Sequence, residues 1–487
     1  MDARDAPAVR ADTSRTGTDI ADAVRRLSRT SVLVVGDAML DRYVYGDVER
    51  ISLEAPVPIL KVRREIAVPG GAGNVMRNLV ALGSAVAFVS VVGDDAAGSE
   101  LTGLIGGQPG VEPWLLVQGQ RRTTEKTRFI AQGGHHGHPM LRADREETAA
   151  VHPKLADRLV RIARDAMAAT TVTVLSDYRK GVLAGDIPAR LIGAARQMGR
   201  RIVADLRGRD YERYAGADVL LTTRRDLARA CTIQPDSDEG FVAAAEQVRR
   251  LHEIGAVMVT SPEAGITLVH DGGSVHFPVD TPDVMDLCGA SDSAVAAAAA
   301  CMAAGLSLPV ATQLATLAAG IVLGRIGTAV VRPDDLLAAQ SPRVGALSKI
   351  VPPEQVAERA ERWRRRGWKA GLVHGCFDPL QSGHVHLLEQ ARAASDRLVV
   401  GLYDDASVHR RKGPDRPVQP EAVRAARIAS LDCVDLVVVV SDRDGSDLIG
   451  ALRPDILAGT SHPAEADQVL SYGGNVLLAD RLPEPSC

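Results

Sequence analysis

The chain has 487 residues, a formal net charge of −4 and 24% charged residues. This length exceeds what one hydrophobic core supports, and the mild charge excludes a strongly basic surface for nucleic acid. No apolar run approaches the roughly 20 residues of a membrane span, and the six cysteines include no CxxC pair, so we expect a cytoplasmic protein without disulfides, a zinc cluster, a nucleic-acid partner or a membrane partner.

The first thirty residues are polar and charged, and they predict a disordered arm over residues 1–30 with a short helix near residues 20–27. From residue 31, short β-branched runs alternate with helical stretches, which is typical of an α/β fold. Mixed strands and turns over residues 43–68 predict a small lid sheet. The predicted strands of this first domain are residues 31–35, 86–92, 172–175, 202–205, 219–222, 256–260 and 266–270.

Periodicity is lost over residues 339–354, where turn residues cluster. We therefore end the first domain at residue 338 and predict a linker over 339–354. The alternation restarts with a basic helix at 355–366, and residues 355–487 suit one compact Rossmann-like domain. The predicted strands of this second domain are residues 369–373, 398–403, 434–440, 455–458 and 475–479.

A short motif, DLCGASD at 286–292, opens an Ala-rich helix. A kinase acting on a hydroxyl group must deprotonate the alcohol and stabilise the transferred phosphoryl group. Asp292 is the candidate base, and the backbone N–H groups of Gly289, Ala290 and Ser291 form a candidate anion hole at the helix N-terminus. The same residues could equally cap an ordinary helix.

Four further motifs occur in order along the first domain: GDAMLD at 36–41, GGAGN at 70–74, VGDDAAG at 92–98 and SDYRKG at 176–181. With them, residues 31–337 resemble the ribokinase (PfkB) superfamily of sugar kinases. The resemblance implies a ribokinase-like α/β domain with a lid sheet, ATP as phosphoryl donor and Mg²⁺ as cofactor. It also implies that Gly265, which precedes the catalytic helix, lies at the nucleotide.

Two runs resemble one member of this superfamily more narrowly: GDAMLDRYVYG at 36–46 and ISLEAPVP at 51–58. They are similar to the heptose-7-phosphate kinase half of the bifunctional enzyme of ADP-heptose synthesis. This resemblance implies that Asp41, Gly71 and Asn74 contact sugar hydroxyls. It also implies that Arg128 and Lys180 bind the 7-phosphate, with a solvated loop lysine as the less favoured alternative for Lys180.

Departures from the superfamily gather on the nucleotide side of this half. Ser291 stands where the superfamily has a glycine, which adds a side chain to the anion hole. The NxxE motif, which orders magnesium-bound phosphate, is replaced by the run TRRD at 223–226, where Asp226 is the remaining carboxylate. We therefore expect the base and sugar-binding residues to be retained and the magnesium-nucleotide side to be weakened.

A second motif, GCFDPLQSGH at 375–384, joins a predicted strand to a helix. Adenylyl transfer needs oriented donors and positive charge around the α-phosphate of the nucleotide. His384, an imidazole at a helix start, is the candidate catalytic group. A lone histidine at a helix start is more often structural, but the complete run is much more specific.

Residues 369–480 resemble the HxGH nucleotidyltransferases, specifically the heptose-1-phosphate adenylyltransferase half of the same bifunctional enzyme. The first histidine of HxGH is Gln381 here, and two family lysines are replaced by His409 and Ala458. Because several charged contacts are lost together, we expect this half to be slow or inactive. The resemblance assigns nucleotide binding to Gly375, Phe377, Asp378, Gln381, Gly383, Lys412 and Arg424.

These motifs together predict an enzyme with two activities, acting on heptose phosphates with ATP. The first half would phosphorylate C1 of heptose 7-phosphate, and the second would transfer AMP from ATP to heptose 1-phosphate. We expect a homodimer. Two alternatives stay open: a sugar kinase with an inactive second domain, and a non-catalytic paralogue that binds sugar phosphates.

Overall fold

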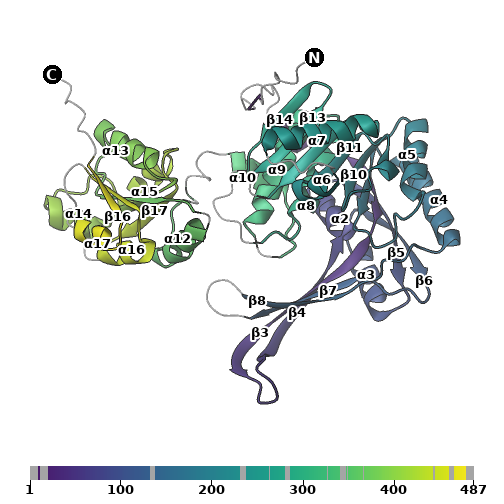
Figure 1. Ribbon diagram of the computed structural model, residues 1–487, viewed down its shortest axis with the longest axis horizontal. Coiled ribbons are helices and arrows are strands. Elements are labelled where there is room, and N and C mark those ends of the chain that lie inside the picture. The colour runs from purple at the N-terminus through teal and green to yellow at the C-terminus, as the bar shows by residue number, and fades with distance from the viewer. Residues whose placement is uncertain are drawn as a thin grey trace. The chain divides into compact units, whose positions relative to one another are not determined.

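The computed structural model describes residues 9–10, 20–131, 138–230, 237–262, 264–279, 286–325, 327–340, 347, 349–365, 367–441, 445–459 and 465–478. The chain divides into two compact units, Met1–Leu337 and Ala338–Cys487 (Figure 1). Each unit is described by itself.

A mixed ten-stranded sheet forms the middle layer of the first unit, in the order β1-β14-β13-β12-β11-β10-β9-β2-β5-β6. The strand β13 pairs antiparallel with both β12 and β14, whereas the strands from β12 to β6 in this order are parallel. The strands predicted from β-branched runs are all present. The bounds are β1 Val9–Arg10, β2 Ser31–Gly36, β5 Ala85–Gly93, β6 Val111–Gln118, β9 Val172–Asp177, β10 Arg201–Leu206, β11 Val219–Thr223, β12 Ala256–Ser261, β13 Gly265–His270 and β14 Gly273–Phe277.

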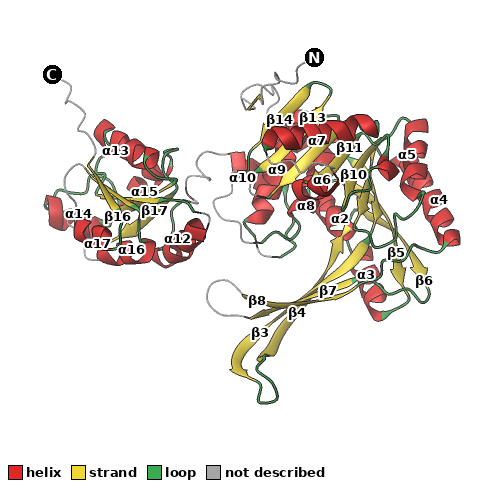
Figure 2. Cartoon of the chain, viewed as in Figure 1, coloured by secondary structure: helices red, strands yellow, loops and turns green. Residues whose placement is uncertain are grey.

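Helices cover both faces of this sheet (Figure 2). Successive side chains of β2 point to opposite faces of the sheet, and both faces need cover because both are apolar. Val32 and Val34 pack in one core, and Leu33 and Val35 pack in the other. The first core contains α1 Ile20–Leu27, α2 Ala72–Ala81, α3 Ala96–Gly106, α8 Ala290–Ala303, α9 Leu308–Leu323 and α10 Pro333–Gln340. The second core contains α4 Pro153–Ala169, α5 Ile187–Gln197, α6 Arg224–Ala230 and α7 Asp238–Leu251.

Helix α1 lies at the predicted position of the short helix, and its packing places this end of the predicted arm on the first core. Its side chains Ala23, Val24 and Leu27 are buried in the first core, and Arg26 donates to the Ala304 carbonyl at 2.6 Å. The helix therefore packs on this unit, because it presents an apolar face to α8. Residues 1–8 and 11–19 lie outside the described residues.

The predicted lid sheet is present and larger than the sequence indicated. Four strands, in the order β4-β3-β7-β8, form a sheet separate from the central one, and the β3–β4 hairpin projects from the unit (Figure 1). The long strand β4 ends at Gly71, directly before α2, and β3 begins opposite it at Ala38. The lid sheet therefore includes the glycines at residues 70 and 71 of the GGAGN motif. The bounds are β3 Ala38–Ile51, β4 Pro58–Gly71, β7 Glu125–Ala131 and β8 His138–Arg145.

The second unit has a parallel five-stranded sheet in the order β17-β16-β15-β18-β19. The chain starts at β15 in the middle, builds outward to β17, then crosses to β18, so the strand order reverses between β15 and β18. Ligands bind at such switch points in open α/β sheets. The bounds are β15 Ala370–Gly375, β16 Arg397–Tyr403, β17 Leu436–Val440, β18 Ile456–Gly459, β19 Asn475–Leu478, α12 Val356–Arg365, α13 Ser382–Ala393, α14 Asp405–Lys412, α15 Glu421–Ala429, α16 Gly445–Leu452 and α17 Ala466–Ser471.

The last part of the predicted linker belongs to this second sheet. The Val351 N–H donates to the Val437 carbonyl at 2.9 Å, and the Val437 N–H donates to the Lys349 carbonyl at 2.8 Å. Residues 341–346 and 348 lie outside the described residues. Among the helices of the described residues, none is long and apolar enough to cross a membrane.

Candidate functional site

Asp292 lies in the first turn of α8 and is buried, with 5% of its surface exposed. Gly289 precedes the helix with a left-handed φ of 81°, and a Cβ there would lie 2.9 Å from Nδ2 of Asn74. The first N–H groups of a helix have no acceptor inside the helix, so those of Ala290 and Ser291 are available to an anion. Ser291 has helical backbone, so its departure from glycine creates no backbone strain.

Three donors surround the Asp292 carboxylate. Asn74 Nδ2 donates to Oδ2 at 2.8 Å, the Tyr178 hydroxyl donates to Oδ1, and the Arg207 guanidinium lies 3.9 Å from Oδ1. Tyr178 follows β9 and Arg207 follows β10, which are adjacent parallel strands. The site is therefore built where α8, α2 and the carboxyl ends of two strands meet.

Sequence reasoning assigned no role to Tyr178, Arg207 or Asp205. Each of them lies at or just after the carboxyl end of a predicted strand, where functional side chains of parallel sheets gather. That position is the signal that could have found them. Their mutual contacts depend on β9 and β10 being neighbours, which the sequence does not show.

Asp205 is a buried carboxylate whose hydrogen-bonding capacity is unused. It is 1% exposed, and neither Oδ atom has a hydrogen-bond partner among the described residues. Burial raises the pKa of Asp205 to about 6, and the Arg207 guanidinium, 3.5 Å away, offsets part of that rise. Such a group costs stability unless a ligand uses it.

The predicted sugar-binding residues lie beside the candidate base. Arg128 Nη1 donates to Asp41 Oδ1 at 2.8 Å, and its guanidinium also covers the ring of Tyr43. Burial raises the pKa of the Asp41 carboxyl, Arg128 lowers it, and the nearby charge of Asp292 raises it further. Gly71, with a φ of 58°, turns the chain from β4 into α2 where a Cβ would strike the Asp37 carbonyl. The structure thus gathers Asp41, Gly71, Asn74 and Arg128.

Lys180 is not a solvated loop lysine. Its side chain is 15% exposed, and its Nζ lies 2.7 Å from Glu146 Oε2. Lys126 of β7 lies 3.5 Å from the other oxygen of the same carboxylate. Glu146 therefore bridges two lysines on the sugar side of the site.

The structure describes fewer contacts on the predicted nucleotide side of this site. Asp226 exchanges hydrogen bonds of 3.0 Å with Thr223, which caps α6. Gly265 begins β13 with a φ of 104°, where a Cβ would lie 2.1 Å from the Phe277 carbonyl, so this glycine is required for packing. Their roles in nucleotide binding stay predictions, and residues 280–285 lie outside the described residues.

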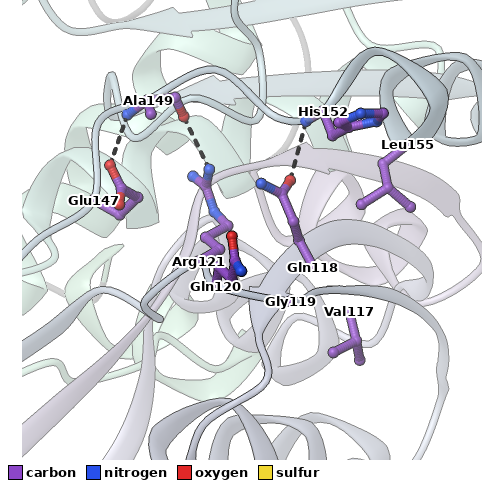
Figure 3. Close-up of a pocket in the computed structure, with 9 residues that line it drawn as sticks. All are labelled: Val117, Gln118, Gly119, Gln120, Arg121, Glu147, Ala149, His152 and Leu155. Carbon is purple, nitrogen blue, oxygen red and sulfur yellow. Dashed lines mark hydrogen bonds between the residues drawn. The ribbon is translucent and has the colours of Figure 1, made fainter.

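A cavity of about 490 Å³ is lined by residues 117–121, at and just after the end of β6, and by Glu147, Ala149, His152 and Leu155 (Figure 3). On its wall, Arg121 donates to the Ala149 carbonyl at 2.9 Å and to the Lys180 carbonyl. Asp37 fixes the turn that carries Tyr178 and Lys180, because its carboxylate accepts the N–H groups of residues 178, 180 and 182. Together they hold Tyr178 in place.

In the second unit, His384 lies in the first turn of α13, after the strand β15 and at the switch point. Its Nδ1 accepts the Gln381 N–H at 3.0 Å, so a neutral ring presents Nε2–H as a free donor. Burial, followed by the charge of Lys412, lowers the pKa of His384, which favours that neutral form. Gln381, the N-cap of α13, and Gly383, in its first turn, are both exposed.

The remaining motif residues mostly build the turn. The Asp378 carboxylate accepts the N–H groups of Val418 and Gln419, and these donors with Arg416 lower its pKa against the effect of burial. Phe377 packs edge-on against the His384 ring at 5.3 Å, and a Cβ on Gly375 would strike the Phe377 ring at 2.8 Å.

Two basic residues of this half have different surroundings. Lys412 Nζ lies 3.4 Å from the Asp378 carbonyl, close enough to lower the pKa of His384. Arg424 is 1% exposed and donates to the carbonyls of Cys376, Tyr403 and Gln419 and to Asp405 Oδ1. Arg424 therefore ties together the loops under the site, and its role as a nucleotide ligand stays a prediction.

Comparison with protein families matches both units. Residues 29–335 match the pfkB family of carbohydrate kinases, and residues 372–469 match the cytidylyltransferase-like family. A protein of Acidiphilium cryptum named "Bifunctional protein HldE" is 55% identical over 470 residues, covering 96% of each chain. A protein of the same name from Rhodospirillum rubrum is 48% identical over 469 residues, covering 95% of this chain and 94% of the other.

Solved structures confirm the fold of the first unit. Phosphofructokinase-2 from Escherichia coli aligns with a TM-score of 0.51 at 17% identity, covering 63% of this chain and 97% of the other. A carbohydrate kinase from Agrobacterium tumefaciens aligns with a TM-score of 0.50 at 20% identity, covering 64% and 96%. The predicted ribokinase-like unit followed by a nucleotidyltransferase-like unit is thereby confirmed.

Proposed function

The chain belongs to the family of bifunctional HldE proteins, and on that premise we propose that it phosphorylates heptose 7-phosphate at C1 and transfers AMP from ATP to heptose 1-phosphate. The observation that carries the kinase half is the buried Asp292 carboxylate beside a left-handed Gly289 at the start of α8. A base and an anion hole in that arrangement suit phosphoryl transfer to an alcohol.

In the kinase reaction, Asp292 takes the proton of the C1 hydroxyl as that oxygen attacks the γ-phosphate. The N–H groups at the start of α8 stabilise the negative charge that develops on the transferred group, and the helix dipole adds to them. The lid strands β3 and β7 carry Asp41 and Arg128 over the sugar, which orients it and excludes water.

Magnesium is part of this proposal as the ion that accompanies ATP, where it neutralises charge on the β- and γ-phosphates. The unused oxygens of Asp205 fit a hard cation or its water ligands. Among the described residues, no group of three acidic, histidine or cysteine side chains forms a metal site by itself. Asp205, with Asp226 in the first turn of α6, is therefore the residue that would orient the ion with ATP bound.

The 7-phosphate fits the cations on the sugar side. Lys126 and Lys180 are held 3.5 Å and 2.7 Å from one carboxylate, Glu146. A phosphate dianion that displaced Glu146 would meet two preplaced ammonium groups, with Arg128 nearby.

In the second reaction, the free Nε2–H of His384 and the ammonium of Lys412 would stabilise charge on the α-phosphate of ATP. The N-terminus of α13 contributes its dipole, and Gln381 adds a neutral amide donor at the N-cap. Because ATP is consumed by both reactions, we place the protein in the cytoplasm.

A homodimer is also part of the proposal. The lid sheet exposes large apolar side chains, among them Ile51, Leu53, Val57 and Val62. Exposed apolar patches on a soluble surface favour association. Light scattering after gel filtration measures the mass, and a monomer at micromolar concentration would exclude this part.

The function is tested by mass spectrometry of the products formed by the full chain. Heptose 7-phosphate with Mg-ATP should yield a bisphosphate and ADP, and heptose 1-phosphate with Mg-ATP should yield ADP-heptose and pyrophosphate. Absence of the first product removes the kinase assignment, and absence of only the second leaves a sugar kinase.

A further inference from the structure

We propose that Tyr178 and Arg207 form a hydrogen-bonded relay that holds Asp292 as a charged, correctly oriented base for the kinase reaction. Both are positioning residues, since they act through Asp292. The inference rests on the proposed kinase function and adds the residues that set the state of its base.

The direction of the relay follows from the donors. A guanidinium only donates, so Arg207 Nη2 donates to the Tyr178 oxygen, 3.3 Å away. The phenol proton must then point elsewhere, and its remaining neighbour is Asp292 Oδ1. The Arg207 guanidinium also lies over the Tyr178 ring, 5.0 Å from its centroid. Arg207 therefore fixes both the place of the phenol and the direction in which it donates.

The charge states of the two partners are suited to this task. Burial and the charge of Asp292 raise the pKa of Tyr178 well above its usual value, so the phenol keeps its proton at every working pH. The carboxylates of Asp205 and Asp292, acting against burial, raise the pKa of Arg207, so the guanidinium stays charged. Tyr178 and Arg207 therefore remain donors toward the base.

The other charged groups around Asp292 oppose the relay. Asp41 of β3 and Asp205 of β10 are both close enough for their charges to interact with that of Asp292. Two neighbouring carboxylates disfavour a third negative charge. The donors Tyr178, Arg207 and Asn74 are what counter them. Without the relay, the base would be charged only at higher pH.

The consequence is a specific pH dependence. A general base must be deprotonated, so kcat/KM falls on the acid side of the profile. In Tyr178→Phe the carboxylate loses a donor to its charged form, and the acid limb should move to higher pH by about one unit. At a pH on that limb, the rate should fall about tenfold, while KM for the sugar phosphate changes little.

Tyr214→Phe is the matched control. The Tyr214 hydroxyl donates to Asp177 Oδ2 at 2.6 Å, which is another buried tyrosine–carboxylate pair in the same unit with Asp177, not Asp292, as its acceptor. The same atom is removed, so a general loss of packing would appear in both variants. Tyr214→Phe should leave the acid limb in place, even if it lowers the melting temperature.

The experiment measures kcat and KM of the full chain for heptose 7-phosphate between pH 5.5 and 9, with ADP release as the signal. An unchanged acid limb in a folded Tyr178→Phe variant, with wild type active, would overturn the relay. If that variant does not fold, Arg207→Gln carries the test, and its acid limb must move in the same direction. Wild type without ADP release would instead refute the proposed kinase function.

Discussion

Asp292 is the residue on which the kinase assignment depends, because it combines burial, a helix N-terminus and three donors. Asp292→Asn should lower kcat by at least about a hundredfold, since the amide cannot take the proton of the C1 hydroxyl. The sugar phosphate should still bind, because Asp41 and Arg128 are unchanged. Calorimetry with heptose 7-phosphate and an ADP-release assay separate these two quantities.

Asp238→Asn is a suitable control for that variant. Asp238 also lies in the first turn of a helix, α7, but its side chain is 74% exposed. Its substitution should leave kcat unchanged. Near-normal turnover in Asp292→Asn with active wild type would show that another group accepts the proton.

Asp205 and Asp37 provide a second prediction, about stability against pH. Burial raises the pKa of both to about 6 from an ordinary value of 3.8. A raised carboxyl pKa stabilises the folded state below the ordinary pKa, and that contribution is lost as pH rises through about 6. At pH 8 each ionised group opposes folding by up to about 3 kcal/mol.

The contacts of these two residues predict opposite results for the same substitution. Asp205 has unused oxygens, so Asp205→Asn should raise the free energy of unfolding at pH 8 by about 1–3 kcal/mol, and the gain should shrink as the pH falls below about 6 and disappear below about 4. Asp37 accepts three backbone N–H groups, and Asp37→Asn should destabilise at both pH values. Chemical unfolding in EDTA measures both, and a destabilised Asp205→Asn at pH 8 would contradict the assignment of an unsatisfied carboxylate.

At the scale of elements, α15 holds the transferase site together through one side chain. Arg424 reaches from this helix to the carbonyls after β15 and at the end of β16, and to Asp405 in α14. Lysine has no planar fork, so Arg424→Lys leaves some of these oxygens unpaired. We expect a loss of about 2–4 kcal/mol in the stability of the second unit.

Arg427→Lys, one turn later on the exposed side of α15, is the matched control and should change the stability by less than about 0.5 kcal/mol. Urea unfolding, followed by tryptophan fluorescence, measures both variants. Equal stability of Arg424→Lys and wild type would mean that the buried fork does not support the loops.

The central strands were predictable because their burial leaves a direct signal. Parallel strands covered on both faces are continuous apolar runs, as in residues 31–35 of β2. The lid strand β8 has the opposite character, since all of its residues are exposed, and no apolar pattern marks it. The short helix α1 was predicted near residues 20–27 as part of a polar arm, and only the structure shows that its few apolar side chains pack in the first core.

Among the site residues, those within local motifs could be proposed from the sequence, and those that meet only through the fold could not. Asp292, Gly289 and His384 could be predicted because each belongs to a local motif whose chemistry is readable from adjacent residues. Tyr178 and Arg207 are 29 residues apart in the chain and meet because β9 pairs with β10. The family resemblance assigned Arg424 to the nucleotide. Arginines are rarely fully buried, and only the packed structure shows where the donors of Arg424 go.

At the scale of the whole molecule, two units with separate hydrophobic cores carry one candidate site each. The boundary between them, predicted at 339–354, stays a prediction that unfolding can test. Thermal unfolding should show two transitions, because each core can melt without the other. Arg424→Lys should lower only one of them.

Separate sites also predict separable activities. His384→Asn keeps an acceptor for the Gln381 N–H but removes the free Nε2–H donor, so ADP-heptose formation should fall about a hundredfold or more while α13 stays capped. The kinase rate of this variant should equal that of wild type, and Asp292→Asn should show the reverse pattern. The two assays on the full chain, each with its own sugar phosphate, measure all four rates. Loss of both activities in a folded single variant would contradict independent sites, because each variant changes one residue of one unit.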